Sequence, residues 1–347
     1  MRVITRDNGA GLSRDLRLIG DVLRHGHEVA TVGLGNGRLR NRLAQWRLCL
    51  ATRLAGPVDA QLSVERIYEP VLATARSNLL MPNPEWFRPS WTALLPRFDR
   101  VLCKSRHAVE IFQRLGCATT YTGFTSADRL DRAVPRERAF FHLAGRSSAK
   151  GTQVVLEAWR RHPEWPRLTV VQCARKARLR VSAANVDHRV GHLDDDELRR
   201  LQNAHRFHLC PSEAEGYGHY IAEAMSVEAV VITTDAAPMN ELVGPACGLL
   251  LPCRPGERLG LDVRHHVDVE AVEAAVMQVL AMDEAACARL GEAARARFLE
   301  NDRAFRTRLQ AVFAAQPRVR HGGRPGVADA IIAWRRPASP SLPPPDR

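Results

Sequence analysis

The sequence has little of what marks secreted, membrane-spanning or zinc-bound proteins. Its eight cysteines are scattered and lack the CxxC spacing of zinc sites. Several, such as Cys103 and Cys210, lie in apolar runs, which favours buried thiols in a reducing compartment over a disulfide or zinc framework. The N-terminus has no long apolar stretch typical of a signal peptide, and no run of about 18 apolar residues predicts a transmembrane helix. We expect a cytoplasmic protein, either free or peripheral at the inner face of the membrane.

Lysine is also scarce, because 47 of the 50 basic residues are arginines. The net charge of +12 is uneven: residues 1–134 hold 20 basic and 12 acidic side chains, residues 135–315 hold 24 of each, and residues 316–347 hold 6 and 2. A basic first part attracts an anionic acceptor, an anionic membrane surface or nucleic acid. The chain carries no nucleic-acid-binding motif, so we expect no nucleic acid. A genomic bias toward arginine codons would give the same excess without any partner.

Apolar runs alternate with helical patterns along the chain, which is typical of α/β domains. A length of 347 residues suits two domains. We therefore predict a first Rossmann-like domain at 1–134, a second at 135–315, and a proline- and arginine-rich tail at 316–347 that we expect to be disordered.

Each predicted domain begins with a strand, a glycine-bearing loop and a helix. In the first domain the loop contains Gly9 and Gly11, which either let a ligand or the facing domain approach the backbone or serve only the turn. A second predicted helix, at 38–54, is rich in arginine and has apolar side chains on one face: Leu39, Leu43, Trp46 and Leu50. Later helices are predicted at 268–297 and 303–315.

The second domain contains the stretch around which the chain is organised, at 207–227. It predicts a buried strand, a sharp loop in which Gly216 and Gly218 flank Tyr217, and a helix. The start of a helix carries unpaired N–H groups and a partial positive charge, which attract phosphate. Glu215 and Glu223 lie on either side of this point, so they suit the hydroxyl-rich groups that flank a diphosphate.

Other polar residues follow predicted strands. Arg146 and Lys150, four positions apart beside a helix start, are suited to clamp a diphosphate. In the first domain, a strand that ends near Pro82 leads into a loop with Asn83, Glu85 and Trp86, our acceptor-side candidates. The acidic run at 194–197 is interpreted as the capped start of a helix rather than a metal site, and we expect no metal.

Several motifs resemble glycosyltransferase family 4, the retaining GT-B enzymes of glycosyl transferases group 1. Glu215 and Glu223 match the family's E-x7-E motif, and Gly145-Arg146 with Lys150-Gly151 matches its GR…KG element. The resemblance is strong over 140–250 and extends by the order of strands and helices over 1–135. It implies a GT-B fold, with two Rossmann-like domains that face a central cleft.

The resemblance also implies an activity and a set of roles. The enzyme would move a sugar, with retention and without a metal or other cofactor, from a UDP- or GDP-linked donor to a hydroxyl of a glycan or lipid-linked acceptor. Arg146 and Lys150 would contact the diphosphate, Glu223 the ribose diol, and Glu215 the transferred sugar, as in a hexosyltransferase. The amides of 216–218 would support sugar or phosphate.

The sequence departs from the family pattern beside this motif. His219 and Tyr220 stand where a small apolar residue is usual, so His219 either hydrogen-bonds the donor or only begins the helix. Glu228 and Val230 replace the usual glycine and proline, and the histidine common near the fourth strand of the first domain has no counterpart. A catalytically inactive nucleotide-sugar-binding or scaffold protein therefore stays as an alternative, and a sugar-nucleotide epimerase as a third.

Overall fold

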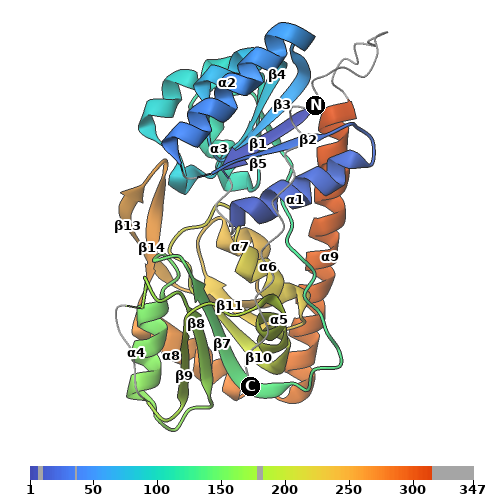
Figure 1. The fold of residues 1–347 in the computed structure, drawn as a ribbon. Coiled ribbons are helices and arrows are strands. Elements are labelled where there is room, and N and C mark those ends of the chain that lie inside the picture. The colour runs from blue at the N-terminus through green and yellow to red at the C-terminus, as the bar shows by residue number, and fades with distance from the viewer. Residues whose placement is uncertain (7–10, 36, 178–182, 315–347) are drawn as a thin grey trace, which may run out of the picture.

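The computed structural model describes residues 1–6, 11–35, 37–177 and 183–314, which form two α/β domains stacked one above the other (Figure 1). The elements of the first domain are β1 (Arg2–Arg6), α1 (Gly11–Arg24), β2 (Ala30–Leu34), α2 (Arg38–Ala55), β3 (Val58–Val64), η1 (Glu69–Thr74), β4 (Ala75–Met81), η2 (Pro84–Trp86), η3 (Pro89–Arg97), β5 (Arg100–Cys103), α3 (Arg106–Arg114) and β6 (Thr119–Tyr121).

The second domain and the terminal helices follow in the same alternating order. Their elements are β7 (Glu137–Gly145), α4 (Thr152–Arg161), β8 (Leu168–Gln172), β9 (Val186–Val190), α5 (Asp195–Ala204), β10 (His205–Cys210), α6 (His219–Ser226), β11 (Val230–Thr234), α7 (Met239–Leu242), β12 (Gly248–Leu251), β13 (Cys253–Leu259), β14 (Asp262–Val267), α8 (Val269–Leu280) and α9 (Glu284–Ala314).

Each domain is built on a parallel six-stranded sheet. The strand order is β2-β1-β3-β4-β5-β6 in the first sheet and β12-β11-β10-β7-β8-β9 in the second. The inner strands are covered on both faces, so they form nearly continuous apolar runs; β11 (Val230–Thr234) is buried at every position. The prediction of two Rossmann-like sheets is confirmed.

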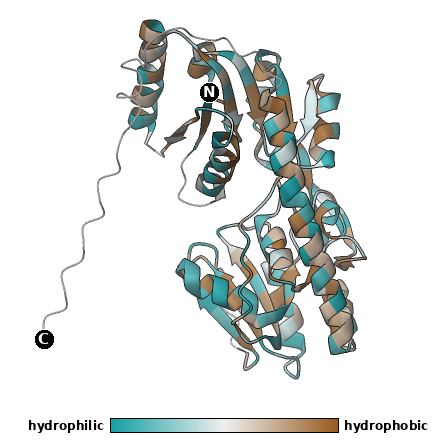
Figure 2. Cartoon of the chain, turned by 90° about the vertical axis from the view of Figure 1, so that its right-hand side faces the viewer, coloured by the Kyte–Doolittle hydropathy of each residue, from teal (hydrophilic) through white to brown (hydrophobic). Residues whose placement is uncertain are grey.

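One apolar core joins the two domains. It includes side chains of β1, β3 and β4, continues through Phe124, and reaches α6 and α9. Helix α9 runs along both domains (Figures 1 and 2) and packs on α1, where Gln310 Nε2 donates to the carbonyl of Val22 at 3.4 Å. Helix α9 therefore contacts α1 of the first domain and α6 and β11 of the second.

Several predicted elements needed correction. The helix expected at 268–297 is two helices, because Asp283 accepts from the amide of Ala286 at 2.7 Å and starts α9, which then continues through the helix predicted at 303–315. The hairpin β13–β14 was not predicted, and the strand expected near 190–193 is β9, at Val186–Val190. The apolar face predicted for α2 exists, and it faces solvent.

Two interpretations made from the sequence are confirmed. Asp194 caps α5, since its carboxylate accepts from the amide of Glu197 at 2.7 Å, as expected for the acidic run. All eight cysteines are free, and four of them are buried. Helix α1 begins at Gly11, whereas Gly9 and the predicted tail at 316–347 lie outside the described residues. None of the described helices is long and apolar enough to cross a membrane.

Candidate functional site

Two loops of the second domain meet where neighbouring strands end. Strands β7 and β10 pair in parallel, so the loop after each emerges at the same edge of the sheet. The amide of Glu213 donates to the carbonyl of Ala149 at 3.0 Å, which ties the loops together. Gly151 adopts a φ of +62°, and a Cβ there would lie 2.3 Å from the carbonyl oxygen of Pro211. Only glycine fits this contact without a shift of the backbone.

Lys150 and Glu215, both predicted from the sequence, form an ion pair between these loops. Ser212 Oγ also donates to Glu215 and lies 2.6 Å from the hydroxyl of Tyr220. The ammonium of Lys150 sits 3.6 Å from the centre of the Tyr220 ring. The pair is mostly buried, so its attraction is screened less than that of a surface pair.

Arg146 lies in the same loop as Lys150 but is exposed. Beside this loop is a cleft of about 510 Å³ that also meets the start of α4 and the hairpin β13–β14. Its polar lining includes Ser147, Ser148, Gln172, Lys176, Glu213 and Arg264. The volume lies within the range of small-molecule sites, roughly 300–1,000 Å³.

The start of α6 lies against the first domain, because its first residue, His219, pairs with Asp15. Gly218 precedes the helix in the left-handed conformation, with a φ of +98° and no side-chain cap. A Cβ on Gly216 would lie 2.4 Å from Cγ of Asn83, so the first domain packs against this loop. The ring of Tyr217 packs edge-on against Phe124, with 5.4 Å between ring centres, and burial raises its pKa.

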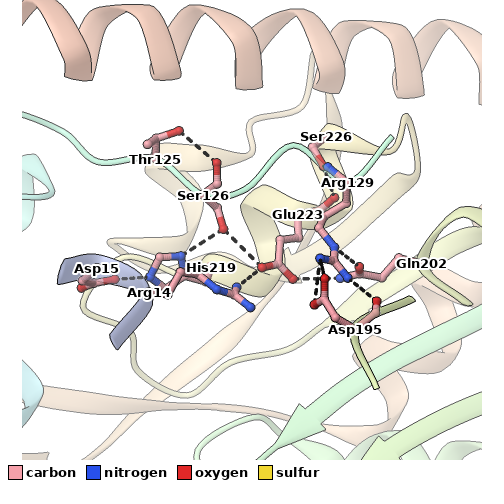
Figure 3. Close-up of polar contacts among 10 residues, drawn as sticks. All are labelled: Arg14, Asp15, Thr125, Ser126, Arg129, Asp195, Gln202, His219, Glu223 and Ser226. Atoms are coloured by element: carbon pink, nitrogen blue, oxygen red, sulfur yellow. Dashed lines mark hydrogen bonds and ion pairs between the residues drawn. The ribbon is translucent and has the colours of Figure 1, made fainter. Parts of the chain in front are cut away.

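Glu223 lies one turn into α6 and is almost fully buried, and Figure 3 shows its polar contacts. Its carboxylate accepts from Gln202 Nε2 at 2.8 Å and from Ser126 Oγ at 3.3 Å, and it pairs with Arg14 of α1. Arg129 continues this network, because it binds both Gln202 and Asp195. In this structure the second glutamate of the motif is thus held by residues of both domains.

His219 begins α6, as one of the two sequence interpretations had it, and reaches the first domain. Its Nε2 lies 2.7 Å from Asp15 Oδ1, and its Nδ1 lies 3.0 Å from Ser126 Oγ. Asp15 also accepts from Lys104 Nζ at 2.7 Å, and both are buried. Burial alone would raise the pKa of Asp15, but the charges of Lys104 and His219 hold it well below its ordinary value.

The acceptor-side candidates lie on the first domain, where Asn83 packs against the loop at Gly216, and we call this surface the acceptor wall. Asn83 Nδ2 donates to Glu65 at 3.2 Å, whereas one oxygen of each of Asn83 and Glu85 has no partner among the described residues. Burial raises the pKa of Glu85 to about 8, and the charges of Glu215 and Glu65 act in the same direction. Trp86 is more than half exposed. The hairpin β13–β14 contacts this part of the first domain, since the amide of Leu261 donates to the carbonyl of Pro84 at 2.9 Å.

Several residues of this region were missed from the sequence. Asp15, Arg14 and Ser126 reach α6 only through the packing of the two domains, so no local pattern marks them. Lys104 had a signal, because it is one of only three lysines and directly follows β5. Glu65 stands at the end of β3 with a φ of +60°, a strained conformation that a sequence does not reveal.

The structure brings together most of the predicted site residues. Lys150, Glu215 and the loop at 216–219 adjoin, and Asn83 touches that loop. Glu223 is buried in α6, and Arg146 is exposed in the same loop as Lys150. Gly9 is outside the described residues. Within the described ranges, no group of three or more acidic, histidine or cysteine side chains could hold a metal ion.

Comparison with known proteins agrees with this architecture. The chain is similar to sucrose-phosphate synthase from Thermosynechococcus elongatus (TM-score 0.67, 16% identity, covering 90% of this chain and 98% of that one). It is also similar to a glycosyltransferase from Rickettsia africae (TM-score 0.64, 14% identity, 90% and 97% covered). Anabaena HepE in complex with UDP-glucose is a third (TM-score 0.64, 14% identity, 91% and 100% covered). No curated protein matches the sequence.

The two facing Rossmann-like domains are therefore those of a GT-B protein, as predicted. The model of the family described as glycosyl transferases group 1 matches residues 139–281. The second domain is thus similar to glycosyl transferases of group 1 over these residues, and the resemblance seen in its motifs is confirmed at that level.

Proposed function

We propose that the protein transfers a sugar from a nucleoside diphosphate sugar to an acceptor hydroxyl, with retention of the anomeric configuration and without a metal. The observation that carries this proposal is the meeting of Lys150, Glu215 and the uncapped start of α6 at one edge of the second sheet. A cation and free helix amides stabilise a departing diphosphate. Glu215 beside them accepts hydrogen bonds from sugar hydroxyls.

In the proposed reaction the bond between the anomeric carbon and the diphosphate oxygen breaks, and the acceptor oxygen bonds to the same face of that carbon. The acceptor's proton passes to the leaving diphosphate. The protein positions the two reactants and balances the charge on the diphosphate, with Lys150 inside the site and Arg146 at its rim. Contact between the domains excludes water, which limits hydrolysis of the donor.

The donor is proposed to be linked to UDP or GDP. Glu223 would accept hydrogen bonds from the ribose diol, and Arg14 would then have to give up its contact with this carboxylate. HepE was solved with UDP-glucose, which supports a UDP-linked donor on this fold. The sugar is proposed to be a hexose.

The acceptor is proposed to be a glycan or a lipid-linked sugar. It would approach from the first domain, where Asn83 and Glu85 carry unpartnered buried oxygens next to the loop at Gly216. Because a buried polar atom without a partner is costly, these oxygens are suited to bind hydroxyl groups. The basic excess of residues 1–134 supports an anionic acceptor.

A thermal-shift series tests the donor site first. UDP, GDP, ADP and CDP are added to the parent and to Glu223→Ala. A nucleotide at ~100 times its dissociation constant stabilises a protein by about 2.7 kcal/mol. We expect UDP or GDP to stabilise the parent and to lose this effect in the variant. If no nucleotide stabilises the parent, the proposal that the second domain binds a nucleotide-linked donor is contradicted.

Turnover then separates an enzyme from an inactive binding protein. The nucleotide that binds is tested as its sugar conjugates with a panel of glycan and lipid-linked acceptors, and the product's anomeric configuration is determined by NMR. We expect the donor's configuration to be kept and the rate to be unchanged by EDTA. Inversion or loss of activity with EDTA would contradict the mechanism, and nucleotide binding without any turnover would favour the inactive alternative.

A further inference from the structure

Helix α2 exposes an apolar stripe to solvent. Of the nine large hydrophobic side chains that are exposed in the described residues, five lie on this helix, which places the feature on one element. They are Leu39, Leu43, Trp46, Leu50 and Leu54, and we call them the α2 stripe. Leu39 is 82% exposed, Trp46 60% and Leu54 75%. Figure 1 shows α2 on the outside of the first domain.

The stripe is continuous because its members recur every three or four residues, which puts them on one face of an α-helix. The helix has 18 residues and is therefore about 27 Å long. Its opposite face holds it on the domain with a small cluster in which Leu48 and Ala44 pack near Ile4 and Val71. The helix thus turns its smaller apolar face inward and its larger one outward.

Arginines line both sides of the stripe. Within α2, Arg40 and Arg47 lie on one flank and Arg42 and Arg53 on the other, as the helical period requires, and the helix contains no acidic residue. Arg42, Arg47 and Arg53 are exposed. An apolar stripe with leucine and tryptophan between basic flanks is the pattern of helices that lie in the surface of an anionic bilayer.

Charge favours an anionic bilayer on the α2 stripe over two other occupants, a second copy of the chain and the segment at 315–347. A second copy docked on the same face would place arginine against arginine, which is repulsive. The segment at 315–347 is itself basic, with six arginines and two aspartates, so the arginines of α2 would repel it as well. Residues 1–134 hold an excess of basic side chains, whereas basic and acidic side chains are equal in number in residues 135–315. This difference in charge also orients the first domain toward an anionic surface.

We propose that the α2 stripe docks the first domain on an anionic lipid bilayer, with Trp46 and the leucines in the headgroup region and the flanking arginines on lipid phosphates. This docking does not depend on the chemistry of the donor site. It would hold the acceptor wall of the protein near a lipid-linked substrate.

Co-sedimentation with vesicles tests the proposal on the full chain. We expect the parent to bind vesicles of equal parts phosphatidylglycerol and phosphatidylcholine, to bind pure phosphatidylcholine far less, and to be released by salt. Leu43→Glu with Trp46→Glu should abolish binding. The control is Met277→Glu with Leu299→Glu, which changes two exposed apolar residues of the other helices α8 and α9 and should bind like the parent.

The arginines are tested separately. Arg42→Gln with Arg47→Gln should weaken binding by about fivefold per arginine, because each basic side chain near an anionic surface contributes about that factor. Arg258→Gln with Arg289→Gln removes the same charge from exposed sites of the second domain and its helices, and it should have a smaller effect. Circular dichroism and melting temperature verify that each variant is folded.

Fluorescence locates the contact without a disruptive change. Brominated phosphatidylcholine mixed into anionic vesicles quenches tryptophans that enter the bilayer. We expect the quenching to be lost in Trp46→Phe and kept in Trp86→Phe, which removes a similarly exposed tryptophan elsewhere in the first domain.

Four outcomes would overturn the proposal: no binding by the parent, equal binding to pure phosphatidylcholine, unchanged binding of the Leu43→Glu/Trp46→Glu variant, or quenching that persists in Trp46→Phe. A parent that is dimeric by light scattering and becomes monomeric in the same double variant would instead assign the stripe to a second copy.

Discussion

At the scale of single residues, the site depends on charges that are buried beside partners of opposite sign. Lys150 and Glu215 pair between two loops, and Glu223 is held by Arg14, Ser126 and Gln202. Such groups cost free energy to bury, and the loss of one partner leaves the other unpaired. Changes at these positions should therefore affect stability and binding in ways that can be separated.

Lys150→Met removes the cation next to the proposed diphosphate. We expect kcat/KM for the donor to fall roughly 10²–10³-fold, as on removal of one group that stabilises transition-state charge. The free energy of unfolding should also fall by about 1–3 kcal/mol, because Glu215 is left buried without its charged partner. Turnover assays and urea denaturation measure the two effects.

A double variant and a surface control separate these effects. Lys150→Met with Glu215→Gln removes both charges, so it should recover much of the stability but not the turnover. Arg160→Met changes an exposed residue of the helix that follows, α4, whose only ion-pair partner among the described residues is its neighbour Glu157, and it should leave both quantities near those of the parent. Normal turnover in Lys150→Met would show that this lysine has no role in the reaction.

Glu85 makes stability depend on pH. Burial raises its pKa in the folded state to about 8, so the folded protein keeps a proton that the unfolded chain releases near pH 4.5. Stability from this group is therefore complete below about pH 4.5 and falls as the pH rises to about 8, by an amount of order a few kcal/mol. Glu85→Gln should remove this fall, so its melting temperature should exceed the parent's increasingly between pH 5 and 8.

Glu110→Gln serves as the control for this experiment, because Glu110 is an exposed glutamate of α3 in the same domain. Its melting curve should follow that of the parent at every pH. Parallel curves for the parent and Glu85→Gln would mean that Glu85 is ionised in the folded protein, and its proposed place on the acceptor wall would lose its support.

At the scale of elements, the loop between β7 and α4 is shaped by glycine. Gly151 has a positive φ and touches Pro211, whereas Gly116 has a similar φ of +78° and no atom within 4 Å of an added Cβ. Gly116→Ala should therefore cost only the left-handed conformation, about 1–2 kcal/mol. Gly151→Ala should cost more, and it should also weaken nucleotide binding because it separates the loops that carry Lys150 and Glu215.

Urea denaturation of both variants and thermal shift with the bound nucleotide check this expectation. Equal destabilisation by the two substitutions would mean that the loops adjust to a methyl group without cost. Nucleotide binding that stays normal in Gly151→Ala would contradict the role of this loop in the donor site.

The sequence predicted elements well where one pattern decided them. The strand–loop–helix units at 139–161 and 207–226 have buried strands, glycine turns and amphipathic helices, and the structure has them there. The sequence predicted less where the burial of an element depends on residues far away in the chain. The stripe of α2 has the period of a core-facing helix, yet the face of α2 that packs on the domain is the opposite one, with Ala44 and Leu48. In the hairpin, β13 is mostly exposed, β14 is half-buried, and both strands are mostly polar, so no apolar alternation marked them.

At the scale of the whole molecule, the two-domain fold could be predicted because each half repeats the same order of elements. The contacts between the halves could not, since they join residues far apart in the chain: Asp15 with His219, Arg14 with Glu223, and His107 with Asp262. These pairs decide how closely the domains sit and what covers Glu223. The pair of His107 and Asp262 is also a contact between the halves on which pH can act.

The pair of His107 and Asp262 gives a prediction for the whole molecule. His107 belongs to the first domain, and its Nε2 lies 2.9 Å from Asp262 Oδ1 of the hairpin. The hydrogen bond to Asp262 raises the pKa of His107, although burial opposes it. A histidine whose pKa is raised on folding stabilises the contact fully below its unfolded pKa, about 6.5, and loses this effect as the pH rises through the folded value.

We therefore expect the contact between hairpin and first domain to weaken as the pH rises above about 6.5. Hydrogen exchange of the amide of Leu261, which donates to Pro84, reports this contact directly. After correction for the intrinsic rate, its protection should fall between pH 6 and 9 in the parent and should be low at every pH in Asp262→Asn. His25→Asn, which changes a histidine at the end of α1 far along the chain from the hairpin, should keep the parent's profile. Protection that is independent of pH in the parent would show that the charge on His107 makes no contribution to the contact between the hairpin and the first domain.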